Sequence, residues 1–143
     1  MSLRGFATLT IWADDVPAAA AWYEELVGVA PYFRRPGPDG RPAYVEFRIG
    51  DHQAELGIID RRYAPPGAST GPGGVLMHWH VDDLEGTVAR LLELGATEYQ
   101  PITHHGAGEG FATASVVDPF GNVLGVMHNP HYQEMLAARA GAA

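Results

Sequence analysis

The 143-residue sequence contains no cysteine and no lysine. Without cysteine, the chain can form no disulfide, no thiolate zinc site and no cysteine nucleophile. All nine basic residues are arginine, so the chain also lacks the amine of a Schiff-base enzyme and the ammonium group of a lysine-dependent phosphate loop. These two absences exclude several common kinds of enzyme.

Positive charge is scarce as well, since the formal net charge is −8 at pH 7. This charge argues against nucleic acid or an anionic membrane as a partner and favours neutral or cationic ligands. The longest apolar run, around residues 16–23, is too short to span a bilayer, and the first residues do not resemble a secretion signal. We therefore expect a cytoplasmic protein. With 46% hydrophobic residues, the chain can bury a sizeable core.

One stretch of the sequence occurs twice. Residues 14–15 and 82–83 are both Asp-Asp, each pair follows a strand-like segment, and each precedes a helix-like segment that ends at a glycine. The two pairs lie 68 positions apart, and the similar segments 55–59 and 123–127 recur at the same offset. A repeat at one fixed offset indicates an internal duplication.

Hydrophobic patterns predict the same order of elements in each half of the chain. Strand, helix and three further strands follow one another twice, so the predicted fold class is α+β with two tandem βαβββ modules. The modules span residues 1–62 and 75–128, a Gly/Pro-rich linker spans 63–74, and a tail with a short helix spans 129–143. The predicted strands are 6–12, 31–35, 43–49, 52–59, 75–81, 97–102, 111–117 and 123–127, and the predicted helices are 18–26, 84–94 and a short one near 133–139.

The same features carry a resemblance to a known group of proteins. The duplicated βαβββ order, the Asp-Asp before each helix and the Asp-Pro-Phe-Gly-Asn turn at residues 118–122 are similar to the vicinal oxygen chelate superfamily. This superfamily includes glyoxalases, bleomycin-resistance proteins and extradiol dioxygenases. The resemblance covers roughly residues 5–128. It implies that each sheet is a half-cup and that the two half-cups surround a central pocket.

The resemblance also implies where a metal would be held. Metal-using relatives carry a His or Gln seven residues before the aspartate that opens each helix, and a Glu on each fourth strand. The corresponding positions in this sequence hold Thr8, Leu76, Gly57 and Gly125. None of these side chains offers the imidazole, amide or carboxylate that the ion needs. We therefore expect that the usual metal site is lost, with no metal and no cofactor.

Histidines offer an alternative site. His78 and His80 share one face of a predicted strand, and Glu46 or Glu55 could approach from neighbouring strands. Two histidines supply only two metal ligands, so we favour structural roles for them. The histidines at 104–105 are expected in a loop, either as a mobile lid over the ligand or simply in solvent.

Strand alternation places a mixed set of side chains on the pocket side of the predicted sheets. The set combines charged, aromatic and apolar groups, which is typical of a small-molecule site. Its two strand glycines either leave room for a ligand where metal ligands once stood or mark close approaches of the backbone. The expected ligand-binding residues are Thr8, Thr10, Trp12, Tyr44, Glu46, Arg48, Glu55, Gly57, Ile59, Leu76, His78, His80, Gly125 and Met127.

Two functions of different class follow from this site. The first is a bleomycin-resistance-like protein without the usual metal ligands, which binds a small aromatic or cationic organic molecule in the cup. The alternative is a glyoxalase-type lyase or isomerase, or a dioxygenase, which is metal-dependent or uses His78 with Glu55 or Glu46 as acid and base. The expected partners are the small-molecule ligand and a second copy of the chain in a homodimer that covers the strand edges. Neither nucleic acid nor a membrane is expected to bind.

Overall fold

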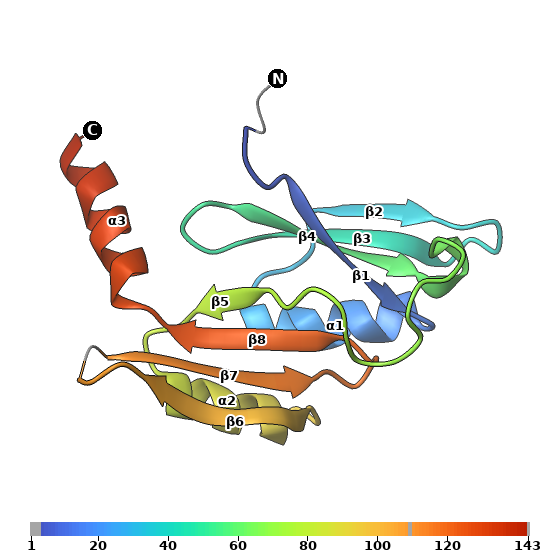
Figure 1. Cartoon of the computed structure of the whole chain (residues 1–143). Helices are drawn as coiled ribbons and strands as arrows, with labels where there is room; N and C mark the ends of the chain where they lie inside the picture. Colours follow the sequence, from blue (N-terminus) through green and yellow to red (C-terminus); the bar gives the residue numbers. More distant parts are fainter. Residues whose placement is uncertain (1–3, 109, 143) are drawn as a thin grey trace. The chain divides into compact units, whose positions relative to one another are not determined.

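Each half of the chain folds into a four-stranded mixed sheet with a helix on one face (Figure 1). The computed structural model describes residues 4–108 and 110–142. It divides into two units, Met1–Ala68 and Ser69–Ala143, and each unit contains one βαβββ repeat. The predicted α+β fold with two tandem βαβββ modules is confirmed.

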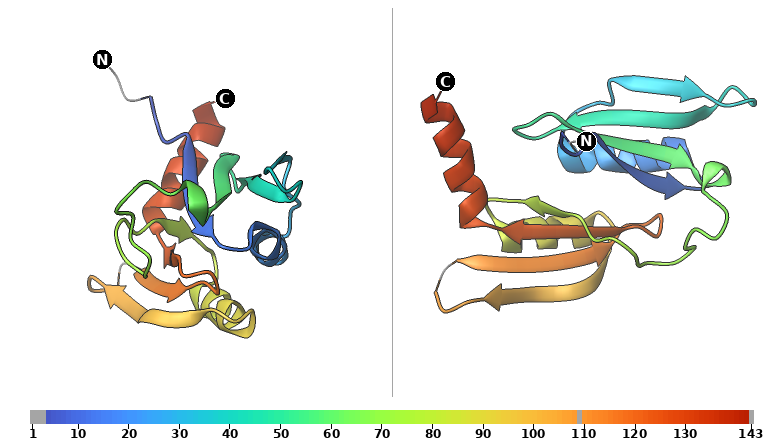
Figure 2. Two further views of the ribbon diagram at one scale, coloured as in Figure 1. Left: turned by 90° about the vertical axis from the view of Figure 1, so that its right-hand side faces the viewer. Right: turned by 45° about the horizontal axis from the view of Figure 1, so that its top comes forward.

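In the first unit, the strand order in the sheet is β1-β4-β3-β2, with β1 parallel to β4 and the other pairs antiparallel. The helix α1 covers one face of this sheet, where it contacts β3 and β4 (Figures 1 and 2). The elements are β1 (Thr8–Ala13), α1 (Val16–Val27), β2 (Phe33–Pro36), β3 (Pro42–Ile49), β4 (Ala54–Asp60) and a short 3₁₀ helix (Arg61–Tyr63).

Local sequence explains where α1 begins and ends. The carboxylate of Asp15 accepts a hydrogen bond from the backbone N–H of Ala18 at 3.1 Å, which satisfies one of the free donors of the first turn. Gly28 ends the helix in the left-handed conformation, with φ of 72°, and its N–H bonds back to the carbonyl of Glu24. The predicted aspartate cap and glycine stop are both present.

The alternation of β3 separates the core from the other face of the sheet. Val45 and Phe47 are fully buried, on the face that α1 covers. Tyr44, Glu46 and Arg48 alternate with them and point to the opposite face. Because cross-strand partners share a face, the register of the sheet then decides which residues of β1, β2 and β4 accompany them.

In the second unit, the strand order is β5-β8-β7-β6, again with one parallel pair, β5 and β8. The helix α2 contacts β6, β7 and β8 on one face, and α3 leads away from the end of β8 (Figure 1). The elements are β5 (His78–His80), α2 (Leu84–Glu93), β6 (Thr97–His105), β7 (Phe111–Val117), β8 (Val123–His128) and α3 (Pro130–Ala142).

The turn between β7 and β8 explains the Asp-Pro-Phe-Gly-Asn motif. Asp118 is only 3% exposed, and one of its carboxylate oxygens accepts the backbone N–H groups of Phe120 and Asn122 at 2.9 and 2.8 Å. A buried carboxylate with two backbone donors stabilises the tight turn that returns the chain to β8.

Two predicted boundaries were wrong in the second unit. The histidines at 104–105 do not lie in a loop, because β6 continues through both and pairs them with Ala112 and Phe111 of β7. The predicted strand 75–81 shrinks to His78–His80, since only these three residues pair with β8.

Fewer apolar residues are buried than the hydrophobic pattern predicts. The hydrophobic pattern of the sequence predicts ten large core residues on the strands and helices, and five of them are buried, namely Leu56, Ile58, Leu91, Leu124 and Val126. The others are only half-buried, namely Leu9, Ile11, Trp22, Met77 and Trp79. The two large tryptophans are too bulky to be enclosed completely by a single helix on a sheet.

The helices of the two units are short. The three α-helices have 12, 10 and 13 residues, so within the described residues no helix could cross a membrane.

Leu91 should carry much of the stability of the second unit. It is 0% exposed, so Leu91→Ala should lower the free energy of unfolding by about 2–5 kcal/mol, because it removes buried methyl groups and leaves a cavity. Leu92→Ala is the matched control, since Leu92 is 42% exposed and its loss should cost less than about 0.5 kcal/mol. Urea denaturation of both variants tests this, and equal losses would contradict the assigned packing of α2.

Candidate functional site

The first unit contains a groove on the face of the sheet opposite α1. Its volume is about 570 Å³, which is within the range of small-molecule sites. The groove extends over β2, β3 and β4 to the 3₁₀ helix that follows β4. Its lining residues are Phe33, Arg35, Pro36, Ala43, Tyr44, Ile59 and Tyr63.

A cluster of carboxylates and tyrosines adjoins this groove, and Tyr44 belongs to both. The hydroxyls of Tyr32 and Tyr44 both donate to the carboxylate of Glu46. The Tyr32 hydroxyl also lies 3.5 Å from Glu55. We call this set the carboxylate cluster; its members are Thr8, Tyr32, Tyr44, Glu46, Arg48 and Glu55.

Three further contacts complete the carboxylate cluster. The hydroxyl of Thr8 donates to Glu55 at 3.0 Å, and the guanidinium of Arg48 forms an ion pair with Glu55 at 3.5 Å. The same guanidinium lies over the ring of Tyr32, 4.2 Å from its centroid. Both glutamates therefore have partners within the first unit.

Strand register brings these residues together. Thr8 on β1 is opposite Glu55 on β4, and Glu55 is in turn opposite Arg48 on β3. On the other edge of β3, Glu46 is opposite Phe33 and Tyr44 is opposite Arg35. The alternation in the sequence therefore predicted this shared face correctly.

The surroundings raise the pKa of two residues of the carboxylate cluster. Burial, followed by the charge of Glu55, raises the pKa of the Glu46 carboxyl above its usual value, while Arg48 acts in the opposite direction. Burial also raises the pKa of the Tyr44 hydroxyl, again with a contribution from Glu55. Tyr44 therefore stays a hydrogen-bond donor near neutral pH, and Glu46 takes up a proton more readily than an isolated glutamate.

The four positions that the family resemblance assigns to metal ligands do not fit a metal ion. Thr8 is hydrogen-bonded to Glu55, Leu76 has no donor atom in its side chain, and the remaining two positions are glycine. Among the residues that the structure describes, no three His, Asp or Glu side chains come together in an arrangement that could hold an ion.

The two strand glycines have a packing reason. A Cβ on Gly57 would lie 2.6 Å from the hydroxyl oxygen of Tyr44, whose ring fills that space. A Cβ on Gly125 would lie 2.7 Å from the carbonyl oxygen of Met77 and 2.9 Å from Cδ2 of His78. The close approach of the backbone considered from the sequence is present at Gly125, whereas at Gly57 the close neighbour is the side chain of Tyr44.

His80 anchors the C-terminal helix of the second unit. Its side chain is 8% exposed, its ring stacks on Tyr132 of α3 with centroids 4.7 Å apart, and its Nδ1 accepts the backbone N–H of Asn129 at 3.1 Å. His80 Nε2 has no hydrogen-bond partner among the described atoms, although the Asp82 carboxylate is 3.4 Å away. The expected structural role explains His80 well.

The other predicted site residues divide between the two units. On β1, Thr10 and Trp12 are paired with Gly57 and Ile59 of β4, so they share the face of the carboxylate cluster. In the second unit, His78 lies against the strand glycine of β8, while Leu76 and Met127 are half-buried. Because His78 and the two glutamates belong to different units, their combination as acid and base stays a prediction.

Sequence reasoning missed six residues of the groove and the carboxylate cluster, namely Tyr32, Phe33, Arg35, Pro36, Ala43 and Tyr63. Tyr32 and Tyr63 lie outside the strands, so alternation could not place them. Phe33 and Arg35 do lie on β2, and their spacing of two residues already indicated a common face.

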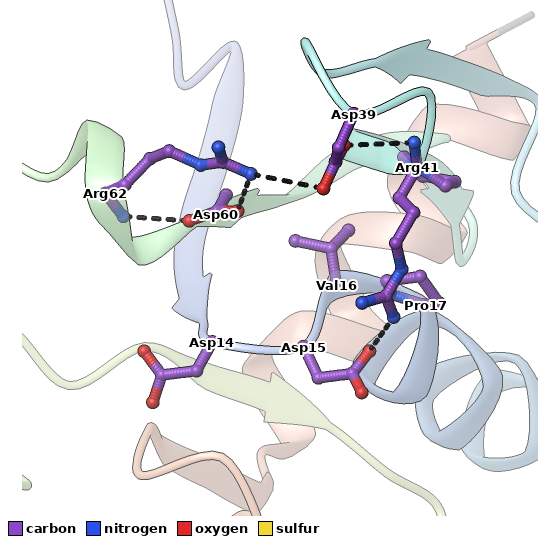
Figure 3. Close-up of a pocket in the computed structure, with 9 residues that line it drawn as sticks. Asp14, Asp15, Val16, Pro17, Asp39, Arg41, Asp60 and Arg62 are labelled. Carbon is purple, nitrogen blue, oxygen red and sulfur yellow. Dashed lines mark hydrogen bonds and ion pairs between the residues drawn. The ribbon is translucent and has the colours of Figure 1, made fainter.

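A second cavity of about 200 Å³ lies between the start of α1, the β2–β3 loop and the end of β4. Figure 3 shows that Arg62 is held between Asp60 and Asp39, with nitrogen–oxygen distances of 2.7 and 4.0 Å. Arg41 pairs with the capping Asp15 at 3.4 Å. The hydrogen bonds from Arg62 lower the pKa of Asp60. These ion pairs connect the β2–β3 loop to the start of α1 and to the end of β4. The charged residues around this cavity therefore have a structural role within the first unit.

Comparison with known proteins agrees with this architecture. The model of the glyoxalase/bleomycin resistance protein/dioxygenase superfamily matches residues 5–126. The chain belongs to this superfamily. The resemblance inferred from the sequence is therefore confirmed.

Solved structures of this superfamily's fold are similar to the chain. A glyoxalase-related enzyme from Fulvimarina pelagi has 21% sequence identity and a TM-score of 0.67, with 90% of each chain covered. A lactoylglutathione lyase from Agrobacterium tumefaciens has 22% identity and a TM-score of 0.61, with 90% of this chain and 96% of that chain covered. A glyoxalase/bleomycin resistance protein from Catenulispora acidiphila has 20% identity and a TM-score of 0.58, with 86% and 96% covered.

These identities establish a shared fold and nothing about shared chemistry. No curated protein matches the chain.

The raised pKa of Glu46 predicts how a substitution should affect stability. A carboxyl whose pKa is higher in the folded protein than in the unfolded one loses stability as the pH rises through the folded pKa. Glu46→Gln should therefore melt at a higher temperature than the unmodified protein at pH 7, and the difference should vanish near pH 4. Thermal unfolding followed by circular dichroism at several pH values measures this.

Glu24→Gln is the matched control, because Glu24 is exposed on α1 of the same unit. It should change the melting temperature little at either pH. A lower melting temperature for Glu46→Gln at pH 7 would mean that the two tyrosine hydrogen bonds to the carboxylate outweigh the cost of its ionisation.

Proposed function

We propose that the chain is a small-molecule-binding member of the superfamily, which holds an aromatic or cationic organic molecule without the usual metal ligands. The single observation that carries this proposal is the groove of the first unit with its aromatic walls. Phe33 and Tyr63 remain 43% and 49% exposed there. Large aromatic side chains left open around one groove are typical of a ligand site.

The chemistry of the groove suits a flat ring. Phe33 packs edge to face on Tyr44, with centroids 6.1 Å apart, so the two rings form a corner in the groove wall. A ligand ring inserted there gains contact area at little cost in side-chain entropy, because aromatic side chains have few rotatable bonds. Ile59 adds an apolar surface on β4.

The carboxylate cluster supports the cationic part of the proposal. Glu46 and Glu55 place two carboxylates beside the groove, since Tyr44 of the groove wall donates to Glu46. The formal net charge of −8 favours the approach of cations from solution.

The absence of suitable donors supports binding without a metal. Thr8 and Leu76 cannot replace a histidine or glutamine ligand, and the two glycine positions are occupied by Tyr44 and by His78.

A second candidate function rests on the raised pKa of Glu46. A glutamate that exchanges its proton nearer neutral pH, with two tyrosine hydroxyls as donors to an oxygen, is suited to proton transfer beside a carbonyl group. This would make the chain a glyoxalase-type isomerase or lyase that works by acid–base chemistry. Turnover of an α-hydroxy or α-keto substrate that is lost in Glu46→Gln would favour this alternative.

The homodimer, the cytoplasmic location and the small-molecule partner stay predictions. Light scattering at micromolar concentrations would measure the oligomeric state directly.

The binding proposal is tested with a panel of aromatic compounds, with indole as the neutral probe. Phe33→Ala and Tyr63→Ala should each weaken binding by about tenfold, because each removes one aromatic wall worth roughly 1 kcal/mol or more. Stability should change little, since both side chains are already largely exposed. Binding is measured by calorimetry, and stability by the melting temperature.

Tyr99→Ala is the matched control. Tyr99 is also 49% exposed but lies on β6 of the second unit, so its removal should leave binding unchanged. A panel without any binder, or an equal loss of affinity in Tyr99→Ala, would contradict the assignment of the groove.

A further inference from the structure

Arg35 is the charged side chain that lines the aromatic groove. It lies on β2, opposite Tyr44, and forms part of the groove wall. Among the described residues, its guanidinium has no ion pair, hydrogen bond or aromatic contact. An arginine in this position presents five N–H donors and a full positive charge to whatever enters the groove.

The other charges on this face already have partners. Arg48 pairs with Glu55, and Glu46 accepts hydrogen bonds from two tyrosines. Since the cross-strand neighbour of Glu46 is Phe33 and not Arg35, Phe33 separates the Glu46 carboxylate from the arginine along β2. The unsatisfied charge in the groove is therefore positive, although the whole chain is negative.

We infer that the ligand of this groove is an aromatic carboxylate, whose ring lies against Phe33, Tyr44 and Tyr63 and whose carboxylate binds Arg35. This inference rests on the proposed function and specifies its ligand class. The planar guanidinium matches a carboxylate in a two-point hydrogen-bonded pair, which is stronger and more directional than a single contact. The volume of about 570 Å³ is ample for an acid with one or two rings.

The negative charge of the chain does not prevent this pairing. At physiological ionic strength, interactions between exposed charges are largely screened beyond about 8 Å. Contact between the ligand and Arg35 is shorter than this length, so salt screens this pairing less than it screens the many exposed carboxylates elsewhere on the chain.

The test compares three probes that share one ring system and differ in charge. They are 2-naphthoate, the neutral 2-naphthamide and the cationic 2-naphthylmethylamine, each titrated into the full-length protein at pH 7 and followed by calorimetry. The naphthoate should bind at least about tenfold more tightly than the amine. Its affinity should fall as salt is raised, whereas the affinity of the amide should not.

Two arginine variants then test whether Arg35 binds the carboxylate of the probe. Arg35→Gln should weaken naphthoate binding by about tenfold or more and leave naphthamide binding unchanged. Arg34→Gln is the matched control, because Arg34 is the adjacent arginine of β2 and is paired with the buried Val45, so it lies on the helix side of the sheet. It should bind all three probes as the unmodified protein does.

The outcomes separate this inference from the proposed function. If the amide or the amine binds as tightly as the naphthoate and Arg35→Gln changes nothing, the carboxylate assignment is wrong, while aromatic binding in the groove stands. If no probe binds, both the carboxylate assignment and the proposed binding of aromatic molecules in the groove are wrong.

Discussion

The packing of α1 on the buried side of β3 is the interaction on which the first unit depends. Val45 and Phe47 are completely enclosed there, together with Tyr23 from the helix. Because side chains alternate along a strand, burying these two residues forces Tyr44 and Glu46 to the opposite face. A slip of one residue in register would exchange the two sets, which would bury a carboxylate and expose the core. The hydrophobic contact with α1 therefore determines which side chains of β3 face the groove, although it lies on the opposite side of the sheet.

A tyrosine lies at a position where metal-using members of the superfamily carry a carboxylate. Gly57 is paired with Glu46 across the sheet, and the ring of Tyr44 from the same neighbouring strand lies over it. A side chain at position 57 would displace that ring, and with it both the groove wall and a hydrogen bond to Glu46. The glycine at position 57 and the aromatic surface of Tyr44 therefore depend on each other at one place in the sheet.

The sequence was informative wherever a regular pattern determined the geometry. The repeat predicted two βαβββ modules, and alternation predicted that Glu46, Arg48 and Glu55 share a face, because strand register carries that information. Tyr32 precedes β2 and reaches the glutamates through its long side chain, and loop geometry of this kind has no periodic signature. The anchoring of α3 by His80 was equally inaccessible, since it depends on a stacked ring supplied by Tyr132.

The net charge of the chain and the charge within the groove have opposite signs. The value of −8 counts every residue equally, but many of the acidic groups around the first unit already have arginine or tyrosine partners. Asp60 is paired with Arg62, and Glu55 with Arg48. What a ligand meets is the charge that remains after such pairing within a few ångströms, because water and salt screen the rest. In this groove the remaining charge is the guanidinium of Arg35, so local pairing and not overall composition decides the sign of the charge that the groove presents.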